Sequence, residues 1–214
     1  MSFLFNHAGD FGQGILLTLG LVVLGGLGSL VLGTLIAALK TSPIRVGRAV
    51  ASAYILVFRN VPLPVQMVLF VFGLPQLGIQ FSLYASAAIA LILYTAPFVA
   101  ETIRAGLNTV DQGELEASRA LGFTPLTSMQ LLVLPQAFAT VIRPLGNVYI
   151  TMLKNTSVAA LIGVAELTFL SDKLAIDEAS PFLVFAGAAI CYLVMGLAIG
   201  RLIAAIDNKV AFSR

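Results

Sequence analysis

The sequence has little of the chemistry on which most enzymes depend. It contains one cysteine and one histidine, and only 10% of its 214 residues are charged. Because Cys191 is the single cysteine, the chain can form neither an internal disulfide nor a cysteine metal cluster, and no Cys/His ligand spacing surrounds His7. No glycine-rich phosphate loop follows a strand pattern. We therefore expect no catalytic residue, no metal site and no cofactor in this chain.

What the chain has in abundance is apolar residues. They make up 59% of the sequence, and the mean hydropathy is +1.00. These values lie outside the range of soluble domains and indicate a protein embedded in membrane lipid. The formal net charge of +2 comes with no basic patch, so we expect no nucleic-acid partner.

Long uncharged stretches predict an all-α integral membrane protein, a single domain over residues 1–214. A spanning helix needs about 20 apolar residues. The uncharged stretch 60–100 is too long for one crossing and contains a turn-rich break at 73–78, so it must hold parts of two spans. The first stretch is too long for a signal peptide and has no basic segment before it. The five expected spans are 14–39, 50–72, 81–103, 129–153 and 181–203.

The distribution of lysine and arginine predicts the orientation, because cytoplasmic loops carry the excess of these residues. With the N-terminus outside and the C-terminus inside, only Lys154 and Lys173 fall in outer segments. The inner segments then hold the other loop cations, Lys40, Arg45, Arg48, Arg104, Arg119, Arg201, Lys209 and Arg214.

A charged segment at 111–122 interrupts the apolar sequence on the predicted cytoplasmic side. Asp111 can cap a helix that carries Glu114 at its third position, and Gly122 stands where a left-handed residue ends helices. The resulting helix, about 112–122, would be roughly 15 Å long. So short a helix is marginal on its own, and we expect it to bind in the groove of a partner protein.

Two charged breaks lie at membrane depth, where a charge is costly and usually faces a cavity or a partner. Arg59 precedes Pro62 and Pro64, which make a continuous helix improbable. Arg59 could line a solute pathway, or it could have a structural role, such as an ion pair with Glu101. The segment 154–157 predicts an unwound stretch of the kind that transporters use to bind solutes.

Other charges favour structural roles. For Arg143 we favour an ion pair or an interfacial anchor, whereas Lys154 is assigned to the pathway. Glu101 and Arg104 are one turn apart and predict a local ion pair that orients the following loop. The glycines at 25, 26 and 28 indicate close helix packing, and we expect Leu153 and Val158 to gate the passage.

Two motifs carry a resemblance to a known family. The first resembles the E-A-A-x3-G-x9-I-x-L-P loop of ATP-binding-cassette (ABC) importer permeases. It consists of Glu116-Ala117-Ser118, three further residues, Gly122, nine further residues and the segment 132–135. The segment 58–66 is similar to F-R-G-T-P-L-L-V-Q of the polar amino-acid permeases, of the glutamate, glutamine and histidine type, although Asn60 and Val61 replace Gly and Thr. Segments 100–106, 144–157 and 162–164 extend the likeness over about residues 10–206, and the Arg-Asn-x-Pro and Lys-Asn-Thr pairings look most like the glutamate-type branch.

The resemblance implies a five-helix permease subunit in the cytoplasmic membrane of a bacterium, which imports a polar amino acid, glutamate in the closest branch. It also implies three partners: a second permease subunit, identical or related; a cytoplasmic ATPase dimer that holds ATP and Mg; and an external solute-binding protein. The implied ATPase-coupling residues are Glu114, Glu116, Ala117, Ser118, Arg119, Leu121 and Gly122. The residues assigned to the substrate pathway are Arg59, Asn60, Lys154, Asn155 and Ser157.

The alternative is a subunit of a secondary transporter or of a passive channel for a small polar solute. A channel would not require the 111–122 helix. A secondary transporter is disfavoured by the small size of the chain and by the lack of a detectable inverted repeat.

Overall fold

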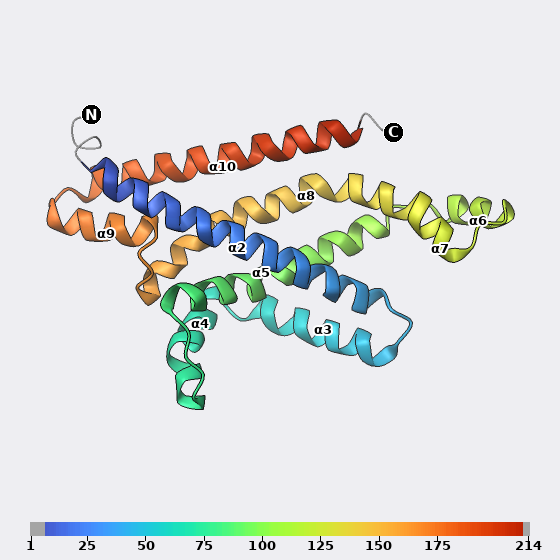
Figure 1. The fold of residues 1–214 in the computed structure, drawn as a ribbon, viewed down its shortest axis with the longest axis horizontal. Helices are drawn as coiled ribbons and strands as arrows, with labels where there is room; N and C mark the ends of the chain where they lie inside the picture. Colours follow the sequence, from blue (N-terminus) through green and yellow to red (C-terminus); the bar gives the residue numbers. More distant parts are fainter. Residues whose placement is uncertain (1–6, 212–214) are drawn as a thin grey trace.

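The computed structural model describes residues 7–211, and every regular element within them is helical. Four long helical stretches are apolar enough to cross a membrane, and they run roughly side by side in Figure 1. The expected spans 14–39, 129–153 and 181–203 fall within them, the expected span 81–103 begins just before its helix, and each helical stretch is longer than its expected span. The stretches are α2 (Ala8–Thr41), α5 (Leu83–Leu107), residues Pro125–Ile162, which include α8 (Leu134–Asn155), and α10 (Pro181–Ala211).

The expected span 50–72 is present as a bent pair of helices, broken at the prolines that were expected to interrupt it. α3 (Arg45–Asn60) ends before the prolines, and the chain bends by 101° into the helical segment Leu63–Leu77. That segment consists of α4 (Leu63–Val68), a π-helical turn η1 (Leu69–Gly73) and a 3-10 turn η2 (Leu74–Leu77). With the bent pair counted as one span, residues 7–211 contain five helical segments that are long and apolar enough to cross a membrane.

The bend has a local cause in the two prolines. Val61, which precedes Pro62, has extended backbone, as steric contact with a proline ring requires. The side-chain amide of Gln66 donates from Nε2 to the backbone carbonyl oxygens of Phe58 (3.1 Å) and Val61 (3.0 Å). A side chain thus binds carbonyl groups that a continuous helix would have paired.

Small residues let α2 and α5 pack closely, as the glycine pattern predicts. Gly28 faces Ile92, and Gly33 faces Val99 so tightly that a β-carbon at Gly33 would lie 2.8 Å from the Ala96 carbonyl oxygen. Next to this contact the apolar core collects side chains from several helices, including Leu21, Met67, Leu91 and Met152.

The segment 154–157 is not unwound, which corrects the prediction. α8 continues to Asn155 and passes directly into a 3-10 helix, η4 (Thr156–Ile162), which ends at Gly163 with φ +83°. The hydroxyls of Thr156 and Ser157 donate to the carbonyls of Leu153 (2.6 Å) and Lys154 (2.7 Å), so the chain stays helical through the change.

The expected gate at Leu153 and Val158 is also wrong. Leu153 is 1% exposed within a core cluster beside α10, and Val158 packs against the core around Leu91. Both side chains stabilise the bundle because the helix continues through this region and turns them inward.

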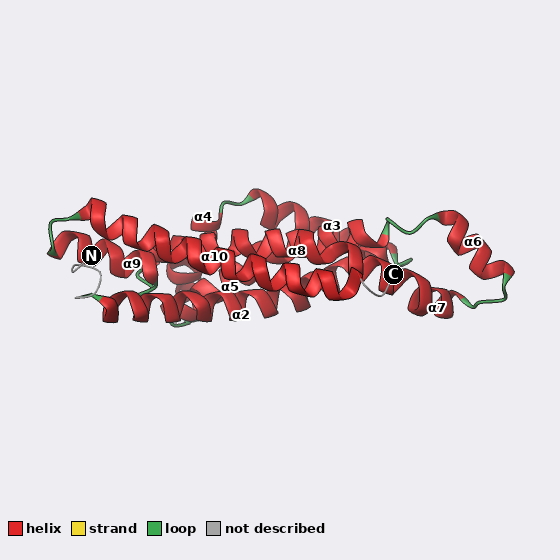
Figure 2. Cartoon of the chain, turned by 90° about the horizontal axis from the view of Figure 1, so that it is seen from above, coloured by secondary structure: helices red, strands yellow, loops and turns green. Residues whose placement is uncertain are grey.

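Short helices mark the two ends of the bundle. α6 (Gln112–Ala120) and α7 (Pro125–Ser128) extend beyond the long helices at one end, and α9 (Leu167–Asp177) lies at the other (Figure 2). α2, α5 and α10 all run toward the α6 end (Figure 1). Of the cations that predict the orientation, Arg214 lies outside the described residues.

Candidate functional site

The predicted helix at 112–122 is present as α6, which ends at Ala120. Asp111 caps it, because its Oδ1 accepts a hydrogen bond from the Gly113 N–H at 2.6 Å. Glu114 has a different contact from the expected capping box. Its Oε2 accepts from the Gln136 side chain at 2.6 Å, which ties α6 to α8.

Gly122 ends α6 in the left-handed conformation, with φ +85°. Its N–H donates to the Arg119 carbonyl (2.9 Å), and the Phe123 N–H donates to the Ser118 carbonyl (3.0 Å). This pair of bonds is a Schellman motif, in which glycine avoids the strain that a β-carbon brings. A β-carbon at Gly122 would meet nothing within 4 Å, so backbone geometry is the reason for glycine within this chain.

The other predicted coupling residues divide into two groups. Ser118 is buried, and its hydroxyl pairs with that of Ser128 at 2.8 Å, which holds α6 against α7. The rest of the predicted set is exposed, and of these residues Glu114 also contacts α8. The exposed residues of that set are Glu114, Glu116, Ala117, Arg119, Leu121 and Gly122, and two apolar neighbours, Phe123 and Leu126, are exposed beside them.

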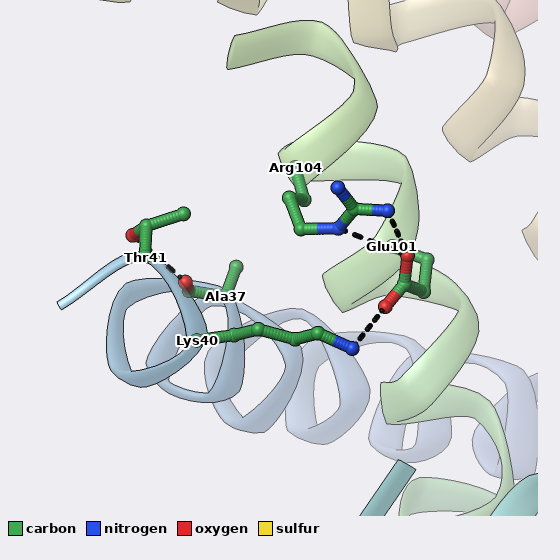
Figure 3. Close-up of polar contacts among 5 residues, drawn as sticks. All are labelled: Ala37, Lys40, Thr41, Glu101 and Arg104. Carbon is green, nitrogen blue, oxygen red and sulfur yellow. Dashed lines mark hydrogen bonds and ion pairs between the residues drawn. The ribbon is translucent and has the colours of Figure 1, made fainter. Parts of the chain in front are cut away.

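An ion cluster joins the ends of α2 and α5 (Figure 3). Arg104 donates to Glu101 Oε2 from Nη2 (2.7 Å) and Nε (3.0 Å), which confirms the predicted local pair. Lys40 at the end of α2 donates to Glu101 Oε1 at 3.0 Å. Sequence reasoning missed Lys40, although its place at the same membrane face as Arg104 was a usable signal. The cluster joins α2 to α5 just before the chain leaves for α6.

Arg59 is not the partner of Glu101. Its guanidinium lies over the Phe98 ring, 5.3 Å from the ring centroid. Arg143 forms the expected structural ion pair, since its Nε donates to Asp207 Oδ2 at 2.6 Å and joins α8 to α10.

Three open grooves surround Phe98. The first, about 350 Å³, lies between α5 and α8 and is lined by Asn147, Thr151 and Asn155. Asn155, one of the predicted pathway residues, thus lines a groove. Asn147 and Thr151 were not among the predicted pathway residues, although their spacing of four places them on one helical face.

The other two grooves extend toward the ion cluster. One, about 470 Å³, continues between α5 and α8 past Glu101 and Arg104. The other, about 370 Å³, is lined by Lys40, Arg59 and Asn60. Phe98 borders all three grooves, and nothing in the sequence set it apart from other apolar residues.

The remaining predicted pathway residues, Lys154 and Ser157, lie outside these three grooves. Lys154 is exposed at the end of α8, and Ser157 uses its hydroxyl within the same turn. The structure therefore brings Arg59, Asn60 and Asn155 around one aromatic residue and places Lys154 and Ser157 at the junction of α8 and η4.

Comparisons with known proteins place the chain among membrane components of transport systems. Residues 29–212 match the family described as binding-protein-dependent transport system inner membrane component. The chain is 36% identical to a glutamate transport system permease protein, GluC, of Corynebacterium efficiens, over 90% of this chain and 94% of the relative. It is 34% identical to a probable glutamine ABC transporter permease protein, GlnM, of Bacillus subtilis, over 91% and 90% respectively.

Solved structures give the same result. A crystal structure of an amino acid ABC transporter with histidines superposes with a TM-score of 0.90 at 34% identity and covers 96% of each chain. An inward-facing structure of the MetNI methionine ABC transporter superposes with a TM-score of 0.75 at 20% identity, which shows a shared fold.

Glu101→Gln should destabilise the chain by about 1–2 kcal/mol, because two half-buried cations lose a charged hydrogen-bond acceptor. The thermal unfolding midpoint in mild detergent measures this loss. Asp207→Asn is the matched control and should cost about 0.5 kcal/mol or less, since the side chain of its partner Arg143 is 75% exposed. Equal midpoints for the two variants would contradict a stabilising role for the Glu101 cluster.

Proposed function

The chain belongs to the family of binding-protein-dependent transport system inner membrane components, and on this premise we propose that it carries a polar amino acid of the glutamate or glutamine kind. It is a permease subunit of an ATP-binding-cassette importer in the inner membrane, and it is not itself an enzyme. This assignment decides against the secondary transporter and the passive channel.

The choice of substrate is supported by the relatives. The proteins named as glutamate and glutamine permeases resemble this chain over nine-tenths of its length. Groove side chains with carboxamide, hydroxyl and guanidinium groups, such as Asn155, Thr151 and Arg59, are suited to a small zwitterion with a polar side chain. We propose that the solute passes along the α5–α8 groove by Arg59 and Asn155, with Asn60 in the adjoining groove and Lys154 and Ser157 at the outer mouth of the path.

Three partners complete the proposed importer. A second permease subunit would form the other half of the pathway, and an external binding protein would deliver the amino acid at the α9 end. A cytoplasmic ATPase dimer, which holds ATP and Mg, would dock on α6. The exposed apolar side chains of Leu121, Phe123 and Leu126 at one end of the molecule support this docking.

The proposed mechanism follows from the attachments of α6. When ATP binding closes the ATPase dimer, each ATPase would carry its docked α6 with it. The motion would reach α5 through the segment 108–111 and α8 through the Glu114–Gln136 hydrogen bond. These two helices form the walls of the groove, so their movement would open it toward the outside, and hydrolysis would reset it.

We propose that the α6 end faces the cytoplasm, with the N-terminus outside and the C-terminus inside. In support, α2, α5 and α10 end on the α6 side, and that side gathers Lys40, Arg104 and Lys209. Acidic residues Asp172, Asp177 and Glu178 belong to the opposite end. This distribution agrees with the excess of cations in cytoplasmic segments.

Single cysteines test the topology in a Cys191→Ala background. An impermeant maleimide applied to intact cells should label Asp177→Cys and leave Asp111→Cys unlabelled until the cells are opened. Labelling of Asp111→Cys but not of Asp177→Cys in intact cells would reverse the assignment.

The transport function is tested with the assembled importer in liposomes. The chain, co-purified with its second permease and ATPase, should take up labelled glutamate or glutamine when ATP and the binding protein are supplied. Labelled leucine is the control and should stay outside. An assembled complex that hydrolyses ATP yet takes up neither polar amino acid would contradict the proposed substrate class.

The coupling role of α6 is tested at Gly122. Gly122→Val should abolish most of the ATPase stimulation by the loaded binding protein, because a β-branched residue is strained at φ +85° by about 1–2 kcal/mol and would distort the end of α6. Gly122→Asn is the matched control, since asparagine tolerates this conformation, and it should keep most of the stimulation. Wild-type stimulation in both Gly122→Val and Glu116→Lys would remove the argument for coupling through α6.

A further inference from the structure

A proline interrupts the backbone bonding of α5 next to the point where the three grooves meet. Pro97 lies inside α5 and is buried. Since proline has no N–H, the carbonyl of Leu93, four residues earlier, loses its helical partner. The Tyr54 hydroxyl of α3 donates to that carbonyl at 2.8 Å, so a neighbouring helix satisfies the freed group, as lipid surroundings demand.

A second contact from α3 lies on the other side of the break. Arg59 places its guanidinium over the ring of Phe98, the residue directly after Pro97. A cation over an aromatic face is attracted by the ring quadrupole, more strongly where water is scarce. α3 therefore holds α5 before the break through Tyr54 and after the break through Arg59.

Phe98 occupies the position of a barrier. It borders the groove lined by Asn155, the groove that leads past Glu101, and the groove beside Lys40. Its ring also packs against Tyr94 one turn away, with centroids 5.5 Å apart. A bulky, half-buried ring between two mostly apolar grooves, each with a few polar side chains, obstructs the route from one to the other.

We propose that Phe98 is the gate of the transport path, and that Tyr54 and Arg59 hold the gate closed by clasping α5 across its proline break. This inference rests on the proposed transport function. The segment 98–107 follows the break and leads through 108–111 to α6, and the Glu101 cluster fastens it to α2. A pull on α6 turns this segment about Pro97, separates Phe98 from Arg59 and opens the groove, while the Tyr54 bond keeps the first part of α5 in place.

The test measures leakage of substrate without ATP. Liposomes that contain the whole importer are loaded with labelled glutamate and glutamine, and efflux is followed in the absence of ATP and binding protein. Phe98→Ala should raise this efflux about tenfold, which corresponds to a barrier lower by about 1.4 kcal/mol. Arg59→Gln should raise it to a smaller extent, because it frees the ring without removing it, and Phe98→Tyr should restore the wild-type rate.

Two matched controls separate the gate from general damage. Phe185→Ala removes an exposed ring on α10, away from the three grooves, and should not leak. Tyr54→Phe removes the bond to Leu93 and should leak, whereas Tyr149→Phe removes a buried hydroxyl that has no hydrogen-bond partner among the described residues and should not.

The outcomes separate a failure of the gate proposal from a failure of the proposed transport function. A wild-type complex that fails to take up either amino acid with ATP contradicts the proposed function. A wild-type complex that transports, together with Phe98→Ala and Arg59→Gln complexes that assemble and do not leak, overturns the gate alone. Should the Phe98→Ala complex fail to assemble, the Arg59→Gln complex tests the gate, since the Arg59 side chain is exposed and not needed for packing. Efflux from the Arg59→Gln complex at the wild-type rate would then overturn the gate.

Discussion

The structure depends on one constraint: inside a bilayer every backbone N–H and C=O group must find its partner within the protein. Several of the described segments depart from a regular α-helix at membrane depth, and at three of these places a side chain bonds to the backbone. Gln66 binds carbonyl groups at the bend between α3 and α4, Tyr54 binds the carbonyl freed by Pro97, and Thr156 binds the carbonyl of Leu153 where α8 becomes 3-10 helix. The departures can therefore persist without water, and they give the long helices defined points at which to bend.

Because water is scarce at membrane depth, a charged side chain there needs a partner within the protein or a polar cavity to face. The carboxylate of Glu101 receives donors from both Lys40 and Arg104, whereas the more exposed Arg143 pairs with Asp207. Arg59 contacts an aromatic ring instead of a carboxylate. A guanidinium at depth with no carboxylate partner among the described residues retains its donors for another anion, which is why this residue belongs with the grooves and not with the ion pairs.

Sequence patterns predicted those features whose cause is local. Some features depend on residues close together in the chain, and their spacing revealed them: the capped helix that precedes Gly122, the break at Pro62 and Pro64, the Glu101–Arg104 pair and the candidate spans. The approach of Lys40 to Glu101 and the position of Phe98 depend on contacts between helices. Leu153 and Val158 were misassigned for the same reason, because a continuing helix turned them toward the core instead of the passage.

The position of α6 links these local features to one movement. α6 is attached to α5 through the segment 108–111, to α8 through Glu114 and Gln136, and to α7 through Ser118 and Ser128. Both walls of the central groove are thus fixed to the helix that extends beyond the bundle. Because packed helices shift as units and do not deform continuously, a displacement of α6 must be taken up where the walls are weakest. In α5 that place is Pro97, where a side-chain bond from Tyr54 replaces a helical one, one residue from the ring that lies between the grooves.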